Sequence, residues 1–195
     1  MTRLTRRILA VVLALLLPAA PAAAADEALW ELLRGGKQVV LIRHAETNME
    51  QRDQAGAPLT DCSRQRNLTD GGREDSRLIG AVFRARAIPV GRVLSSDYCR
   101  CLETAQLAFG RVEPWLPLQQ ALTDKDVQAR RAAEIRALAS EPPAGGNLIL
   151  VSHQYTIRVL TGVQIGEGEL LILTPKGGSV FDIAGRIPPE GLPDP

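Results

Sequence analysis

The sequence contains few of the residues from which metal centres are built. Its 195 residues include only two histidines and three cysteines. A structural zinc ion takes about four protein ligands, and both histidines stand where another role is predicted below. We therefore expect no bound metal and no cofactor. The sequence also lacks a glycine-rich loop that ends in lysine and cradles phosphates, which argues against nucleoside-triphosphate chemistry of that kind.

Neither sign of charge is in excess. The chain has 23 Lys and Arg against 22 Asp and Glu. Removal of the N-terminal segment described next would take away three arginines and leave 20 basic against 22 acidic side chains. Because nucleic-acid binding calls for a basic surface, this balance argues against nucleic acid as the main partner. No pattern in the sequence indicates the oligomeric state.

Long apolar runs are confined to the N-terminus. Three arginines within the first seven residues precede an apolar core at residues 8–17, and small residues follow up to Ala25. This order is typical of a secretory signal peptide, and the apolar core is too short to span a bilayer. We expect residues 1–25 to be cleaved, with an uncleaved anchor as the alternative, and residues 26–195 to form a single domain in the periplasm or outside the cell. No later stretch is long enough to be a membrane span.

Two short apolar runs end at the only two histidines of the chain. Residues 39–42 are followed by Arg43 and His44, and residues 148–152 are followed by His153. A short unbroken apolar run fits a strand that is buried on both faces of a parallel sheet. In such sheets, ligands bind outside the carboxyl ends of the strands. If the two strands are parallel neighbours, both imidazoles lie at one edge of the sheet.

Helical and extended patterns alternate along the chain, which predicts an α/β layered sheet. Pro114 and Pro117 would restrict the segment that contains them to an edge strand. Asp97 is a candidate cap for the helix that follows it. Strands are expected at 39–42, 92–96, 112–118, 148–152, 169–174 and 179–183, and helices at 28–34, from Thr69 or Asp70 to Ile88, from Asp97 to Gly110, and at 126–140 and 156–160.

A long polar loop is predicted at residues 50–65, near the end of the first histidine strand. Long loops of this kind inside compact domains are often functional lids. The loop carries Cys62, and an exported protein enters an oxidising space where a disulfide is expected. Cys99 and Cys101 are too close in sequence to pair comfortably, so we expect Cys62 to pair with one of them.

The residues at the two strand ends suit a phosphoryl group. The guanidinium of Arg43 offers planar, charged donors that match phosphate oxygens. A neutral imidazole nitrogen can attack phosphorus and form a covalent intermediate. A second, protonated imidazole can offset the negative charge on the oxygens that are being transferred.

Three motifs resemble those of the histidine phosphatase (phosphoglycerate mutase-like) superfamily. Residues 41–47, LIRHAET, resemble its Arg-His-Gly signature, with Ala45 where glycine is commoner. Residues 95–105, SSDYCRCLETA, resemble the second motif, and residues 150–153, LVSH, resemble the third. The resemblance covers residues 39–160. It implies a three-layer α/β/α sandwich with a mostly parallel central sheet.

The resemblance also implies a role for each matching residue. His44 would be the nucleophile that becomes phosphohistidine. Arg43 and Arg100 would bind the phosphate, and His153 would contact the same phosphate and stabilise the transition state. The implied activity is metal-independent hydrolysis of a small-molecule phosphomonoester. A phosphate on an envelope sugar is one candidate substrate for an exported member, and a phosphate-binding module without turnover and a phosphomutase are the alternatives.

The proton donor departs from the pattern of the family. Gln154 follows the second histidine, where the acid phosphatase branch carries aspartate. In the other branch the donor is a glutamate in the segment after the third strand, which matches residues 118–126 here. We expect Asp124 to act as the general acid that protonates the leaving oxygen, with Asp126 as the second choice, although both also suit a helix cap. Without a carboxyl in the site, turnover on poor leaving groups would be slow.

Overall fold

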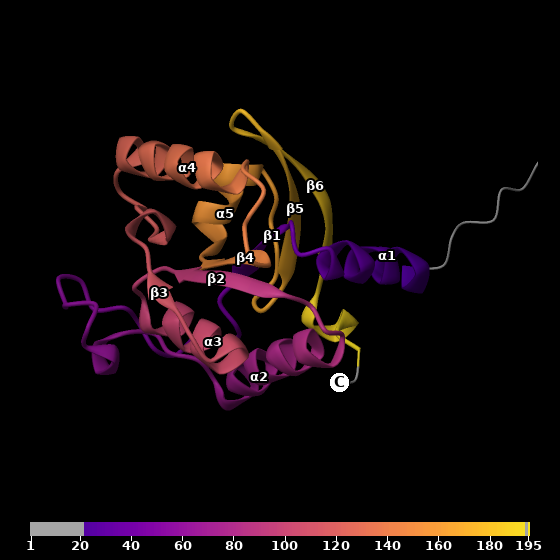
Figure 1. Cartoon of the computed structure of the whole chain (residues 1–195). Helices are drawn as coiled ribbons and strands as arrows, with labels where there is room; N and C mark the ends of the chain where they lie inside the picture. The colour runs from indigo at the N-terminus through magenta and orange to yellow at the C-terminus, as the bar shows by residue number, and fades with distance from the viewer. Residues whose placement is uncertain (1–21, 194) are drawn as a thin grey trace, which may run out of the picture.

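The computed structural model describes residues 22–193 and 195, and in that part of the chain a six-stranded sheet lies between two layers of helices (Figure 1). The strand order is β3-β2-β4-β1-β5-β6; the first four strands are parallel, and β5 and β6 are antiparallel. The predicted three-layer, mostly parallel sandwich is therefore confirmed.

The strands are β1 (Val39–Arg43), β2 (Val90–Ser95), β3 (Glu113–Pro114), β4 (Asn147–Ser152), β5 (Leu170–Gly177) and β6 (Val180–Ile187). The helices are α1 (Ala22–Arg34), α2 (Asp70–Ala85), α3 (Cys99–Phe109), α4 (Lys125–Ala139) and α5 (Gln154–Thr161), with 3₁₀ turns at Cys62–Arg64, Leu116–Leu118 and Pro189–Gly191.

Strand β1 is buried on both faces, as its unbroken apolar run predicts. Val40 and Ile42 pack into the core beneath α1, α2 and α3, whereas Val39 and Leu41 pack into the core beneath α4 and α5. None of the four side chains is more than 1% exposed. Because successive side chains of a strand point to opposite faces, a single apolar segment supplies both cores. The strand therefore holds its polar end, Arg43, in a fixed place.

The register between β1 and β4 brings the two histidines together. The strands are parallel neighbours, and Arg43 pairs with Ser152. The backbone N–H of His44 donates to the carbonyl of Ser152 over 3.0 Å. His44 and His153 are the residues that follow this pair, so both leave the sheet at the same edge, as predicted.

The start of α2 packs tightly against the chain just beyond His44. The Thr69 hydroxyl accepts from the N–H of Gly72 and donates to a carboxylate oxygen of Glu46, so it caps the helix and ties it to the loop after β1. A side chain at Gly72 would have its Cβ 2.2 Å from the Glu46 carbonyl oxygen. Only glycine permits this approach, which fixes the backbone two residues from His44.

Two sequence predictions differ from the structure. The edge strand expected at 112–118 is reduced to Glu113–Pro114, followed by the 3₁₀ turn at Leu116–Leu118, because the two prolines cannot donate to a ladder. Asp97 does not cap α3, since Tyr98 precedes the helix without a capping side chain and the Asp97 carboxylate instead accepts from Gln119.

The predicted signal peptide lies mostly outside the described residues. Helix α1 begins at Ala22, before the predicted cleavage point at Ala25. Within residues 22–193 and 195, no helix has both the length and the apolar character needed to cross a membrane.

Candidate active site

A pocket of about 250 Å³ opens at the carboxyl ends of β1 and β4. It contains both histidines of the chain, and the elements around it are β1, the loop before α2, the segment before α4, and the first turns of α5. Its lining consists of Arg43, His44, Arg66, Gln120, His153, Gln154, Tyr155 and Arg158.

His44 is held as a neutral imidazole. Its side chain is almost fully buried, and Nδ1 lies 2.9 Å from the carbonyl oxygen of Ala45, so Nδ1–H is the donor. Burial lowers the pKa of His44 to about 3, and the positive charges of Arg100 and Arg43 act in the same direction. With the proton on Nδ1, the lone pair of the ring is on Nε2. This is the protonation state that nucleophilic attack requires.

His153 faces His44 with 5.6 Å between the ring centres. Its Nε2 is 2.8 Å from the Ser96 hydroxyl, and its Nδ1 is 3.4 Å from a guanidinium nitrogen of Arg100. Because arginine can only donate, Nδ1 is the acceptor and Nε2–H donates to Ser96. Burial, and then the charge of Arg100, keep the pKa of His153 well below its usual value. The protonated second imidazole expected from the sequence is therefore absent from the free protein.

Arg43 reaches the pocket from the last position of β1. One terminal nitrogen donates to the carbonyl of Ile165 over 3.1 Å, and the other donates to the carboxylate of Glu167 over 3.0 Å. Its Nε is buried and has no hydrogen-bond partner among the described residues. Arg43 is thus anchored on one side by the loop before β5, while its remaining surface lines the pocket.

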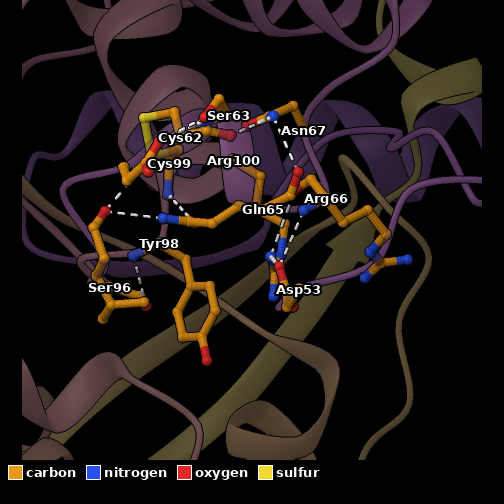
Figure 2. Close-up of a disulfide and its surroundings, with 12 residues drawn as sticks. Asp53, Cys62, Ser63, Gln65, Arg66, Asn67, Ser96, Tyr98, Cys99 and Arg100 are labelled. Atoms are coloured by element: carbon orange, nitrogen blue, oxygen red, sulfur yellow. Dashed lines mark hydrogen bonds and ion pairs between the residues drawn. A yellow bond between two sulfur atoms is a disulfide. The ribbon is translucent and has the colours of Figure 1, made fainter. Parts of the chain in front are cut away.

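Arg100 lies on the first turn of α3 (Figure 2). Its side chain is 1% exposed, donates to the Asp53 carboxylate over 3.0 Å and packs on the Tyr98 ring. Its Nε is buried and unpaired among the described residues. Arg43 and both imidazoles therefore line one anion-sized pocket, whereas Arg100 lies outside the lining and contacts it through Nδ1 of His153.

A family model supports this assignment independently of the geometry. Residues 39–122, which include Arg43, His44 and Arg100, match the model of the histidine phosphatase superfamily (branch 1). The fold agrees with that match. This part of the chain belongs to the histidine phosphatase superfamily. His153 lies beyond the matched residues, and the structure brings it to them.

Solved structures of several phosphatases share this fold at low sequence identity. The protein histidine phosphatase SixA in complex with tungstate superposes with a TM-score of 0.59 at 18% identity, covering 80% of this chain and 99% of SixA. A mycobacterial glucosyl-3-phosphoglycerate phosphatase gives 0.54 at 19% identity, covering 75% and 98%. A mutant phosphoserine phosphatase from Entamoeba histolytica, in complex with phosphoserine, gives 0.52 at 15%, covering 80% and 98%. No curated protein matches the sequence.

Sequence reasoning missed two guanidinium groups that line this pocket, those of Arg66 and Arg158. Arg66 comes from the long loop before α2 and lines the pocket beside Arg43. Its backbone N–H donates to Asp53 over 3.0 Å, and its side chain lies 4.0 Å from Glu167. Burial lowers the pKa of Arg66, as does the charge of Arg100. Nothing in the polar loop sequence distinguishes Arg66 from the arginines around it.

Glu167 is a second site residue without a sequence signal. Its carboxylate accepts from Arg43 and from the Thr47 hydroxyl, both over 3.0 Å, and lies 3.9 Å from Nδ1 of His44. It stands on the Nδ1 side of the nucleophile. From there it can offset the positive charge that the ring gains when Nε2 is phosphorylated.

Asp124, the residue predicted to donate the proton, does not line the pocket. Its carboxylate caps α4 by accepting from the N–H groups of Asp126 and Val127 over 3.0 and 2.9 Å, and it is exposed, as is Asp126. From the same segment, Gln120 lines the pocket instead. A carboxamide cannot serve as a general acid. Among the described residues that line the pocket, none carries a carboxyl group.

The depressed histidine pKa values predict a loss of stability in weak acid. In the unfolded chain the imidazoles take up protons near pH 6.5, whereas folded His44 does so only near pH 3. Unfolding therefore takes up protons as the pH falls through this window. This favours the unfolded state by up to about 1.4 kcal/mol per pH unit for each histidine, and by on the order of 5 kcal/mol for His44 over the whole window.

Urea unfolding at pH 6.0 and 5.0 measures this effect, because most carboxylates remain ionised between these values. Since the chain has only two histidines, a His44→Gln variant should lose about half of the slope. A free energy of unfolding that is constant or rises between pH 6.5 and 5 would show that the imidazoles are not kept neutral.

Proposed function

We propose that the protein is a phosphoric monoester hydrolase that works through a phosphohistidine at His44. The observation that carries this proposal is the state of that side chain, a neutral imidazole with Nδ1 anchored and Nε2 free, in a pocket with three guanidinium groups. Guanidinium groups bind the three outer oxygens of a phosphoryl group and stabilise the charge that develops on them.

The proposed reaction has two steps. The Nε2 lone pair attacks phosphorus, the bond from phosphorus to the leaving oxygen breaks, and the leaving group departs with that electron pair. Water then attacks the phosphohistidine, the P–N bond breaks, and phosphate and neutral His44 are released. In both steps Arg43, Arg66 and Arg158, which line the pocket, can hold the phosphoryl oxygens. Arg100 acts through the ring of His153, to which it donates.

The missing carboxyl limits the substrates that we propose. A leaving alkoxide needs a proton, and general acid catalysis typically supplies about 10²–10⁴ in rate. With Gln120 at the pocket, the site suits substrates whose leaving group departs with little protonation, such as aryl phosphates, acyl phosphates and phosphoramidates. The name of SixA, a protein histidine phosphatase, agrees with this class, since phosphohistidine is a phosphoramidate.

The same observation favours a second candidate function, a phosphate-binding module with little turnover. Trapping experiments distinguish the two. The protein is mixed with radiolabelled p-nitrophenyl phosphate, and both acid-labile labelled protein and free phosphate are measured. We expect a labelled intermediate and stoichiometric release of phosphate. If neither appears while phosphate still binds, the binding module is correct, and an isomeric sugar phosphate in place of free phosphate would indicate a phosphomutase.

We also propose that the protein is exported and that its substrate is a small or envelope-associated phosphorylated compound. Support for this comes from the N-terminal pattern of three arginines, an apolar core and small residues. A mass spectrum of the protein recovered from the periplasm tests it. A chain that begins at Asp26 is expected, and a full-length chain that stays in the cytosol would contradict export.

A further inference from the structure

The loop at residues 48–67 has almost no apolar anchor. We refer to this segment as the clasp loop. Its base is closed by a bridge between Thr47 and Leu68, both buried. From residue 48 to residue 64 every side chain is exposed or half-buried, and Met49 is 62% exposed. Loops with few buried contacts open at low free-energy cost, so packing alone does not hold this one.

A disulfide ties the clasp loop to α3. Cys62 is bonded to Cys99, the first residue of that helix (Figure 2). The attachment point is firm, because the helix buries Cys101 and Ala105 against the sheet. The Gln65 side chain adds a polar link, since it accepts from the N–H of Cys99 over 3.0 Å. The sequence left Cys99 and Cys101 open as partners, and the structure pairs Cys62 with Cys99.

The clasp loop carries two charged groups that lie at the site. Arg66 lines the pocket, and Asp53 pairs with Arg100, the residue directly after Cys99. Arg66 and Asp53 are linked to each other, because the backbone N–H of Arg66 donates to the Asp53 carboxylate. Arg66 is also linked to α3, because its carbonyl accepts from Arg100 over 3.4 Å. The disulfide therefore lies four residues from Arg66 and one from Arg100.

We propose that the Cys62–Cys99 disulfide is a positioning element of the anion pocket, which holds Arg66 in place so that phosphate binding depends on the intact S–S bond. The inference rests on the phosphate-binding role proposed above. Arg100 stays on α3 whether or not the bond is present, so Arg66 is the group that reduction displaces. Confining a loop of this length removes chain entropy that would otherwise oppose binding.

The chemistry of the bond permits a clean test. Cys62 is exposed, so a dithiol can reach it. Dithiothreitol gives up two electrons and two protons and closes to its own cyclic disulfide, and the Cys62–Cys99 bond becomes two thiols. The third cysteine does not interfere, because Cys101 is fully buried and burial raises the pKa of its thiol to about 12. It therefore stays a thiol and does not attack the disulfide.

The experiment measures the affinity for inorganic phosphate by calorimetry. We expect the reduced protein to bind phosphate at least tenfold more weakly than the oxidised protein, because one charged hydrogen-bonding group leaves the site. The Cys62→Ser/Cys99→Ser double variant should reproduce this loss without reductant. An affinity that changes less than twofold in both cases would overturn the proposal.

Two controls separate positioning from general stability. In an Arg66→Ala background, which already binds phosphate more weakly, reduction should cause less than a twofold further change, because the group it displaces is gone. A Leu33→Ala variant, altered in the core beneath α1, serves as a variant of lowered melting temperature with the disulfide intact. It should bind phosphate like the wild type well below its melting temperature.

Several results of these phosphate-binding measurements would contradict the proposal. A loss on reduction that is as large in Arg66→Ala as in the wild type would show that the disulfide does not act through Arg66. Weak phosphate binding in Leu33→Ala would attribute the effect to stability. Failure of the oxidised wild type to bind any phosphate would instead contradict the proposed function, and the inference with it, whereas a redox-independent affinity contradicts the inference alone.

Discussion

Replacing His44 with alanine is expected to lower the turnover of p-nitrophenyl phosphate by a factor on the order of 10⁴–10⁶ and to remove the acid-labile phosphoprotein, as loss of an enzymatic nucleophile does. The reason is that no other pocket residue can take its place. His153 is the other imidazole, and its Nε2–H donates to Ser96 while its Nδ1 faces Arg100. The assay is steady-state release of p-nitrophenol, combined with trapping of the labelled protein.

Phosphate affinity provides the control for this variant. Arg43, Arg66 and Arg158, which line the pocket, stay in place in His44→Ala. Inorganic phosphate should therefore still bind within about tenfold of the wild type, a factor that corresponds to about 1.4 kcal/mol. Binding that survives while turnover disappears separates the nucleophile from the anion site. Turnover within tenfold of the wild type would mean that His44 is not the phosphoryl acceptor.

Replacing Gln120 with glutamate is expected to raise the hydrolysis of an alkyl phosphate by about 10²–10⁴, because general acid catalysis typically contributes that much. The change is nearly isosteric and supplies a carboxyl at the pocket, where the wild type has a carboxamide. Aryl phosphates should gain little, because their leaving groups need less protonation. The measurement is kcat/KM for glycerol phosphate and for p-nitrophenyl phosphate in both proteins.

Asp124→Asn is the matched control for this prediction. Asparagine caps a helix about as well as aspartate, and Asp124 contacts the start of α4 rather than the pocket. Both rates should therefore stay at the wild-type level. If the wild type already hydrolyses alkyl and aryl phosphates equally fast, or if Asp124→Asn slows the alkyl substrate alone, an acid outside the pocket lining reaches the leaving group.

The sheet and its two histidines could be predicted from the sequence because their signals are local. An unbroken apolar run identifies a strand that is buried on both faces, and the residue at its carboxyl end is then fixed in place. This reasoning located Arg43, His44 and His153 at the pocket, and the motif around Arg100 identified an arginine that contacts His153 from outside the pocket lining. Strands β5 and β6 also correspond to the two segments predicted at 169–174 and 179–183.

Most of the residues that sequence reasoning missed lie on irregular segments, and Arg158 on α5 is the exception. Arg66, Gln120 and Glu167 come from loops, and the path of a loop depends on distant contacts that carry no periodic pattern. The disulfide constrains the first of these loops, and the turn at Leu116–Leu118 constrains the second. Asp124 is a carboxylate in the segment expected to supply the general acid, which is why the sequence favoured it. The same position caps α4, and the hydrogen bonds of the cap determine where the side chain lies.

The hydrogen bond between the His44 N–H and the Ser152 carbonyl has a practical consequence for changing the substrate specificity of the site. The separation of the two imidazoles is set by main-chain pairing between β1 and β4. Most of the remaining pocket lining comes from two other segments, the one before α4, with Gln120, and the first turns of α5, with Gln154, Tyr155 and Arg158. A combinatorial library restricted to those two segments would therefore explore new specificities without altering the alignment of the nucleophile.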